Sequence, residues 1–260
     1  MSIKKLIFFV LFFTLFTPSP SKAQNVVFSP TANPGNTFTF DINAGFRNIR
    51  TWRFEISLLD APNHVRVFEG EGHPPQEIIW NGKDSAGNIV PCGIYAGVLY
   101  VILRNQTHSI ENAQVIIDTT PPLASITIHE DISFLKNGSL TQNFQIHISA
   151  SDENGIDFSR TNLTIFTGNH RQVKSYFFGR NIPAYIIWDG RGSHSTRVMP
   201  PGHYRIVFSV FDIAGNSSFV NSEIFIVPFV EPQSLHITDT VDTDENMPEE
   251  SKYEKKVATQ

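Results

Sequence analysis

Short stretches of this chain alternate apolar and polar residues, which is the pattern of a half-buried β-strand. Residues 37–42 and 52–58 alternate in this way, and similar stretches return around residues 144–148 and 204–210. No stretch keeps a helical period for longer than about two turns. The pattern therefore predicts an all-β fold. The positions expected to face a core are Phe38, Phe40, Ile42, Phe54, Ile56, Phe144, Ile146, Ile148, Leu163, Ile165, Tyr204, Ile206, Phe208 and Val210.

One stretch of the sequence occurs twice. The two tryptophans that end an apolar strand are 188 − 80 = 108 positions apart, and the tyrosines that open the next long strand are 204 − 95 = 109 apart. One loop residue has therefore been gained, and the chain is predicted to be a tandem repeat. The motif consists of Trp80, Gly82, Asp84, Gly87, Gly93 and Tyr95 in the first copy, and of Trp188, Asp189, Gly190, Gly202 and Tyr204 in the second.

Each copy of this motif predicts a β-hairpin. The tryptophan is followed at once by Asn81-Gly82 or Asp189-Gly190. In such pairs the Asx side chain bonds the backbone ahead and glycine is free to take positive φ. We expect Trp80 and Tyr95 to cover the base of the first hairpin, mainly through buried aromatic area. The motif is therefore interpreted as structural.

The repeat and the linker residues divide the chain into domains. Residues 118–122 end in Pro121-Pro122, which makes a stiff connection because proline fixes φ and restricts the residue before it. We predict two tandem β-sandwich domains, residues 24–120 and 121–228, each with about seven short strands. Residues 229–260 are acidic and poor in apolar side chains, so they are predicted to be a disordered tail.

The first 23 residues are typical of a secretory signal peptide. Lys4 and Lys5 precede an apolar core at residues 6–16, and residues 21–23 provide a small-residue cleavage site. We expect cleavage after Ala23 and no membrane span in the mature chain, since no later stretch is long and apolar enough.

Composition, cysteine count and net charge limit the classes of protein that this chain can belong to. Aromatic residues make up 12% of the chain and charged residues 17%, which suits β-rich packing. Cys92 is the only cysteine, so no disulfide within the chain exists. The net charge of −5 comes without a basic patch, and we therefore expect no nucleic-acid partner.

The strand that begins at Tyr95 is apolar on both faces. Its second face carries Val98, Tyr100 and Ile102. Such a face needs a cover, which could be packing within the domain, a neighbouring domain or a partner protein. We favour cover from the same chain and take these residues as a possible partner face.

The first copy of the repeat reads Ile79-Trp80-Asn81-Gly82-Lys83-Asp84, then Ala86-Gly87, Val90-Pro91, Gly93 and Tyr95. This order resembles the immunoglobulin-like domain at the C-terminal end of flagellar hook-capping proteins, a module widespread in bacterial secreted and envelope proteins. The resemblance covers residues 36–118 and, more weakly, 142–228, where residues 192–197 lack the usual Asp and Ala-Gly. It implies an immunoglobulin-like β-sandwich used for spacing and protein contact.

The sequence lacks several common catalytic motifs. It contains no H-E-x-x-H and no G-x-S-x-G motif, and Gly70-Glu71-Gly72 lacks the third glycine of a dinucleotide-binding loop. Residues 152–157 are rich in oxygen ligands and could hold Ca²⁺, but they lack the full EF-hand set and also fit an ordinary turn. We expect no catalytic residues and no cofactor.

These features together predict an exported, non-enzymatic structural or adaptor protein of a bacterial cell envelope, in the periplasm or at the outer surface. It would act by contact with envelope proteins through its immunoglobulin-like domains. The alternative is an adhesive or glycan-binding module at the cell surface, with cell-wall glycan as the partner.

Overall fold

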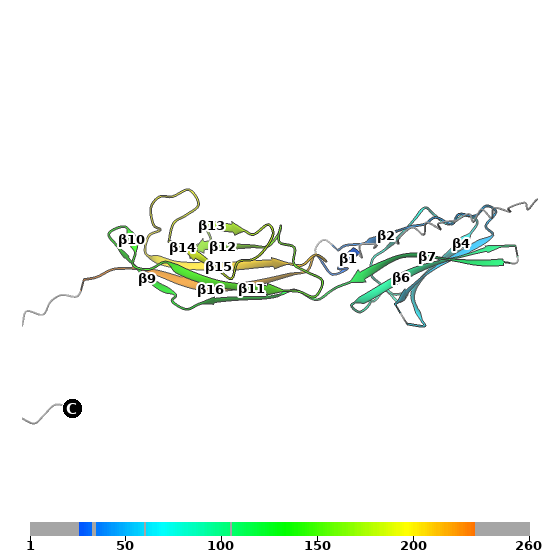
Figure 1. The fold of residues 1–260 in the computed structure, drawn as a ribbon, viewed down its shortest axis with the longest axis horizontal. Coiled ribbons are helices and arrows are strands. Elements are labelled where there is room, and N and C mark those ends of the chain that lie inside the picture. The colour runs from blue at the N-terminus through cyan, green and yellow to red at the C-terminus, as the bar shows by residue number, and fades with distance from the viewer. Residues whose placement is uncertain (1–25, 33–34, 60, 105, 232–260) are drawn as a thin grey trace, which may run out of the picture. The chain divides into compact units, whose positions relative to one another are not determined.

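The structure, a computed structural model, describes residues 26–32, 35–59, 61–104 and 106–231. These residues form sixteen β-strands and no helix (Figure 1). The all-β prediction is confirmed. The described residues up to Pro228 belong to one compact unit. The predicted signal peptide and nearly all of the predicted tail lie outside the described residues.

The first half of the unit is built from two sheets that share one core. A five-stranded sheet has the order β1-β7-β6-β3-β4, and β2 pairs with β5 in a two-stranded sheet. Phe40, Ile78 and Trp80 from the small sheet meet Phe54 and Leu99 from the large one in a single hydrophobic cluster. The strands are β1 (Val26–Phe28), β2 (Phe38–Asp41), β3 (Thr51–Leu58), β4 (His64–Glu71), β5 (Glu77–Trp80), β6 (Gly93–Leu103) and β7 (Gln106–Ile117).

The second half repeats this plan with additional strands. A six-stranded sheet has the order β10-β9-β16-β15-β12-β13, and a three-stranded sheet has the order β14-β11-β8. They enclose a second hydrophobic cluster. The strands are β8 (Leu123–Ile128), β9 (Ile132–Lys136), β10 (Ser139–Leu140), β11 (Phe144–Ser151), β12 (Asn162–Thr167), β13 (Gln172–Phe177), β14 (Tyr185–Trp188), β15 (Gly202–Phe211) and β16 (Ser217–Pro228).

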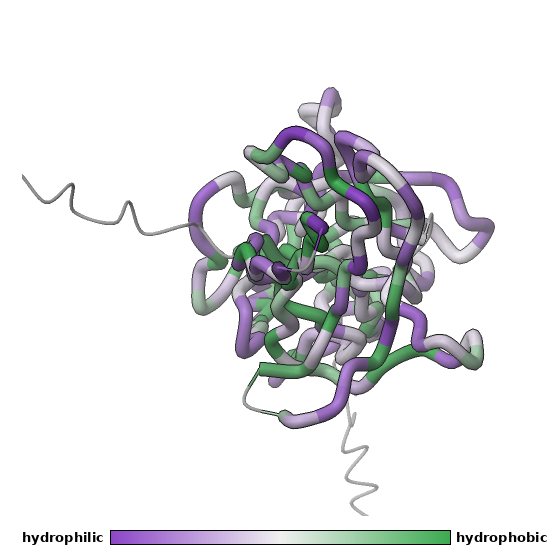
Figure 2. Tube along the Cα trace, turned by 90° about the vertical axis from the view of Figure 1, so that its right-hand side faces the viewer, coloured by the Kyte–Doolittle hydropathy of each residue, from purple (hydrophilic) through white to green (hydrophobic). Residues whose placement is uncertain are grey.

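The alternation read from the sequence determines which side chains enter the cores. In β15, Tyr204, Ile206, Phe208 and Val210 are buried while the residues between them are partly exposed. Figure 2 shows hydrophobic and hydrophilic residues following one another along the tube. Of the predicted core positions, only Phe38 is more than marginally exposed, and it still packs against the first cluster. The periodicity predictions are therefore confirmed, whereas the division into two domains at residues 120 and 121 stays a prediction.

The structure contains strands beyond those predicted from the sequence. The second half has nine strands where about seven were expected, because residues 132–140 form a hairpin of β9 and β10. Its turn residues Asn137 and Gly138 have φ of 51° and 79°, as a two-residue type I′ turn requires. The Asn-Gly pair was the available signal. β1 was also missed; it pairs in parallel with β7, just as β9 pairs in parallel with β16.

The first tryptophan of the repeat sits at the base of its hairpin. Trp80 is 1% exposed, and its Nε1 donates a hydrogen bond to the Lys83 carbonyl at 2.9 Å. Its ring centroid lies 5.2 Å from that of Tyr95. The Tyr95 hydroxyl donates to the Pro91 carbonyl at 2.9 Å. One aromatic pair thus holds both ends of the loop between β5 and β6.

The second copy repeats the same contacts. Trp188 Nε1 donates to the Arg191 carbonyl at 2.8 Å, and the Tyr204 hydroxyl donates to the Pro200 carbonyl at 2.6 Å. The two ring centroids are 5.4 Å apart. The sequence repeat is therefore also a repeat of hydrogen bonds.

Trp80→Ala is expected to lower the free energy of unfolding by roughly 3–5 kcal/mol, because a large buried side chain is removed from the core. Chemical denaturation measures this loss. Ile79→Ala is the matched control, since Ile79 is the preceding residue but is 60% exposed; it should cost less than about 1 kcal/mol. An equally small loss for Trp80→Ala would contradict the assignment of Trp80 to the core.

Candidate protein-binding face

The first repeat loop is shaped by Asp84. Its Oδ1 accepts hydrogen bonds from the backbone N–H of Ala86 at 2.9 Å and of Asn88 at 2.8 Å. The bond from the Asn88 backbone, helped by those from the Asn88 side chain and the Ala86 and Gly87 amides, holds the pKa of Asp84 below its ordinary value. The carboxylate therefore acts as the fixed acceptor around which the loop turns.

Glycine is required two residues after the tryptophan that ends each of these strands. Gly82 has φ +70° and Gly190 has φ +78°, in the left-handed region that side chains disfavour. A Cβ on Gly82 would also lie 2.8 Å from Pro30 Cβ. Gly87 lies at the tip of the first loop with φ 88°, and Gly93 and Gly202 begin β6 and β15.

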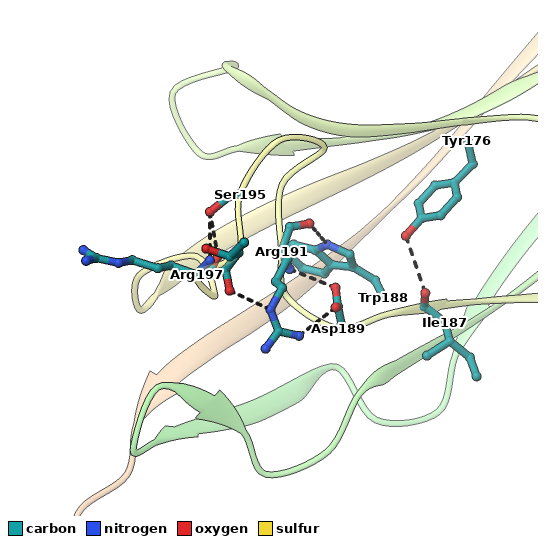
Figure 3. A network of polar contacts seen from close by, with 8 residues as sticks. Tyr176, Ile187, Trp188, Asp189, Arg191, Ser195 and Arg197 are labelled. Atoms are coloured by element: carbon teal, nitrogen blue, oxygen red, sulfur yellow. Dashed lines mark hydrogen bonds and ion pairs between the residues drawn. The ribbon is translucent and has the colours of Figure 1, made fainter.

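The second loop uses a different device, because residues 192–197 lack the Asp and Ala-Gly of the first loop. Arg191 donates through Nη1 to Asp189 Oδ2 at 2.8 Å and through Nε to the Thr196 carbonyl at 3.0 Å (Figure 3). Burial raises the pKa of Asp189, but hydrogen bonds from Arg191 and the charges of Lys174 and Arg191 together hold this pKa below its ordinary value. The guanidinium thus organises this loop as the Asp84 carboxylate organises the first.

The motif residues build two hairpin loops rather than a cleft. Asp84 accepts hydrogen bonds from its own loop, and Asp189 accepts them from Arg191 in its own loop. The motif positions the strand that follows each loop. In the first half that strand is β6.

The predicted partner face lies on the outer side of β6. Val98 and Tyr100 are partly exposed and Ile102 is 38% exposed, while the alternate residues Leu99 and Val101 are buried in the core. We favoured cover of this face by the same chain, and that expectation stays a prediction, since Val98 and Tyr100 are partly buried whereas Ile102 is exposed. The alternation gives β6 one face in the core and one face toward the outside of the sheet.

A groove of about 580 Å³ opens on this outer face. Register pairs Arg53 of β3 with both Tyr100 of β6 and Glu69 of β4, so all three lie in one row across the sheet. Arg53 Nε forms an ion pair with Glu55 Oε1 at 2.7 Å. The lining residues are Thr51, Trp52, Arg53, Glu55, Glu69, Gly70, Glu71, Tyr100, Ile102 and Thr107.

The linker is tied to the second half by Asn216. Its Nδ2 donates to the Asp118 carbonyl at 3.0 Å, to the Thr120 carbonyl at 3.2 Å and to Asp212 Oδ2 at 2.8 Å. Ser218 Oγ adds a bond to the Pro122 carbonyl at 2.6 Å. The prolines of the linker predict its stiffness, whereas no local pattern in the sequence predicts this anchoring amide.

Three carboxylates meet beside the linker. The oxygens of Asp118, Asp152 and Asp212 all lie within 4.8 Å of one another, a spacing that could accommodate a cation. The chain itself provides donors: Asn154 Nδ2 reaches Asp118 at 2.8 Å, and Asn216 N reaches Asp212 at 2.8 Å. Burial raises the pKa of Asp212, and the charge of Asp152 adds to this, against hydrogen bonds from Asn216 and Gly215.

The predicted calcium loop at residues 152–157 is divided by the fold. Asp152 joins the three carboxylates, and its Oδ1 accepts the backbone N–H of Asn154 at 2.8 Å and of Gly155 at 3.1 Å. Asp157 instead accepts the Ser159 N–H at 3.0 Å. These are the hydrogen bonds of ordinary Asx turns, so the turn interpretation accounts for the loop.

A hollow of about 600 Å³ lies beside these carboxylates and includes Cys92. The Cys92 thiol is exposed, and its Sγ accepts the Thr119 N–H at 3.3 Å. Burial raises the pKa of this thiol, but hydrogen bonds from Thr119 and Thr120 bring it below its ordinary value.

Asn216→Ala is expected to lower the free energy of unfolding by about 1–3 kcal/mol, because it leaves two linker carbonyls and one Asp212 oxygen without this donor in a buried site. Denaturant melts measure the loss. Asn221→Ala, at an exposed position of β16, is the matched control. Equal effects of the two changes would refute the anchoring role of Asn216.

Asp152→Asn is expected to raise the free energy of unfolding at neutral pH. The new amide oxygen still accepts the Asn154 and Gly155 N–H groups, while a negative charge near Asp212 disappears. Since folding raises the pKa of Asp212, its ionisation opposes folding above that pKa and has no effect below the unfolded value of about 3.9. The gain should therefore vanish as pH falls through this range.

Thermal melts between about pH 3 and pH 8 with a chelator present measure this pH dependence. The contrary outcome is that Asp152→Asn lowers the free energy of unfolding and that the chelator lowers it by the same amount in the unsubstituted chain. That result would contradict the account and show that a cation holds the carboxylates together.

Within the residues that the structure describes, no helix is long and apolar enough to cross a membrane. Comparison with family models found no match, and neither did comparison with curated proteins.

Comparison with solved structures found chains of low similarity. A bacterial ice-binding adhesin involved in host cell surface retention is 11% identical, with 79% of this chain and 61% of that chain covered and a TM-score of 0.43. The adhesin domain of Epf from Streptococcus pyogenes is 11% identical, covering 76% and 68%, with a TM-score of 0.32. Latent PorU from Porphyromonas gingivalis is 13% identical, covering 79% and 19%, with a TM-score of 0.29. The chain thus spans less than two thirds of the first and third of these structures, and similarity at this level carries no argument about function.

Proposed function

We propose that this chain is an exported, non-enzymatic adaptor of a bacterial cell envelope, which acts by protein contact through two tandem immunoglobulin-like sandwiches. The observation that carries the proposal is the outer face of β6. Val98, Tyr100 and Ile102 form an apolar strip on the surface of a sheet whose other face already fills the core. Apolar side chains aligned on a rigid sheet suit a protein interface.

The export part of the proposal rests on the N-terminal sequence. Lys4 and Lys5, the apolar core at residues 6–16 and the small-residue site ending at Ala23 have the order of a secretory signal. The resemblance of the repeat to hook-capping-protein domains supports a bacterial envelope, in the periplasm or at the outer surface. The non-enzymatic part of the proposal is supported by the motif residues Asp84 and Asp189, which accept hydrogen bonds within their own hairpin loops.

A glycan is the second candidate ligand, and the groove favours it. An aromatic ring at Tyr100 lies in a row with Arg53 and Glu69, and rings flanked by polar groups can bind sugar rings. A pull-down with cell-wall polysaccharide tests this candidate. Retention that Tyr100→Ala abolishes would favour the glycan, whereas no retention would leave the protein interface as the proposal.

The test of the adaptor function is a crosslinking pull-down from envelope extract of the native host with tagged residues 24–260. We expect Val98→Lys to reduce capture of the partner by roughly tenfold or more, because a charge is placed in an apolar contact. Val207→Lys is the matched control, since Val207 occupies the equivalent place in β15, at 98 + 109 = 207.

Tagged residues 24–228 form the third arm of this experiment. Capture by both lengths places the contact in the sandwiches. Capture by the longer chain alone would assign the contact to the acidic tail and contradict the proposal, as would equal loss from Val98→Lys and Val207→Lys.

A further inference from the structure

The strand β4 leaves one side of its backbone open. β4 is the last strand of the five-stranded sheet and pairs with β3 alone. Gly72 N donates to the Arg50 carbonyl at 2.9 Å. The even-numbered residues of β4 are therefore the ones whose backbone N–H and C=O groups bond to β3. The N–H and C=O groups of Val67, Glu69 and Glu71 therefore point away from β3.

Only the beginning of this edge is covered within the described chain. Ser85 N donates to the Val65 carbonyl at 2.9 Å, and Arg66 Nη1 donates to the Asp84 carbonyl at 3.2 Å. The loop of the first repeat thus closes the edge at Val65. From Val67 to Glu71 the edge is free to pair with one more strand.

The open edge borders the groove on the outer face. Glu69 and Glu71 are exposed and line it, together with Tyr100. Among the lining residues described, Arg53 is the only cation against Glu55, Glu69 and Glu71, so the groove carries a charge of 1 − 3 = −2. Arg53 is already paired with Glu55 at 2.7 Å, which leaves the carboxylates of Glu69 and Glu71 available to a positive charge.

Charge also decides which occupant fits. A second copy of this chain paired edge to edge through β4 would bring Glu69 and Glu71 against like charges, which opposes self-association. A strand carrying Lys or Arg would instead meet two carboxylates and the ring of Tyr100, which attracts a cation over its face. The groove therefore suits a basic extended segment.

We propose that the edge of β4 binds an extended, basic peptide segment of the partner protein as an added strand, with a Lys or Arg side chain held in the groove by Glu69 and Glu71. Backbone hydrogen bonds to Val67, Glu69 and Glu71 supply affinity, and the groove selects the charge. Every second residue of the segment faces the groove, so the basic residues recur with a period of two. The inference rests on the proposed function and adds the chemistry of the partner.

The second half of the chain offers an internal comparison. β13 is also an edge strand, and Ser193 N closes its start by donating to the Val173 carbonyl at 3.1 Å. At the repeat spacing of 108, Val67 and Glu69 correspond to Ser175 and Phe177. The second edge has similar backbone geometry without the carboxylates, so the basic segment is expected to bind at β4 only.

The experiment uses isotope-labelled residues 24–260 and an eight-residue peptide of Val and Thr with Lys at alternate positions. We expect amide shifts at Val67, Glu69 and Glu71 and none at Ser175 and Phe177. Changing both Glu69→Gln and Glu71→Gln should weaken binding by roughly tenfold or more. Glu111→Gln, an acid on the same sheet that does not line the groove, is the matched control and should have little effect.

Two further peptides separate strand addition from simple charge attraction. A peptide with Glu in place of Lys should not bind, and a Lys peptide with alternate backbone amides methylated should lose binding because it cannot extend the sheet. Equal binding of the methylated peptide, or no effect of the double Gln change, overturns the proposal.

Absence of shifts at millimolar peptide also overturns the proposal. If the crosslinking pull-down still captures a partner that Val98→Lys loses, the adaptor function survives and only the basic-strand inference fails. If that capture fails as well, the proposed function falls with it.

Discussion

The pairing of a tryptophan with a tyrosine at the base of each hairpin is the constraint on which the rest of the structure depends. The indole N–H satisfies a carbonyl at the start of the loop, and the tyrosine hydroxyl satisfies a carbonyl at its end. Both rings are buried, so the loop and the core cannot form independently. The second pair makes the same contacts although the loop between its members has changed in length and sequence.

With the core secured in this way, the outer surfaces of the two halves are free to differ. The long strands β6 and β15 both alternate buried and exposed positions. Outside the core, β6 presents Tyr100 beside an acidic groove, whereas β15 presents Ser209 at the equivalent place. The edge strands β4 and β13 have similar backbone geometry, but their side chains differ in charge. Recognition in this account resides in those differences, and the repeat itself is scaffold.

The core positions and turns could be predicted from the sequence, because they depend on periodicity and on local turn chemistry. Phe144, Ile146 and Ile148 were expected in the core from alternation alone, and they lie there. The hairpin of β9 and β10 could also have been found, since Asn137-Gly138 is a turn signal in its own right. Cover of the outer face of β6 could not be predicted in detail, because apolar content does not tell which residues lie against a face. The three carboxylates and the Asn216 anchor involve residues up to 98 positions apart, which only the fold brings together.

The most direct test of the central claim is native-state hydrogen exchange of the three tryptophan indole protons. The account predicts that the Nε1–H groups of Trp80 and Trp188 exchange slowly, because each is buried and bonded to a carbonyl. Trp52, which is only partly buried at the start of β3, should exchange much faster. Exchange of Trp80 or Trp188 at the rate of Trp52 would contradict the claim that these aromatic pairs hold the two hairpins to their cores.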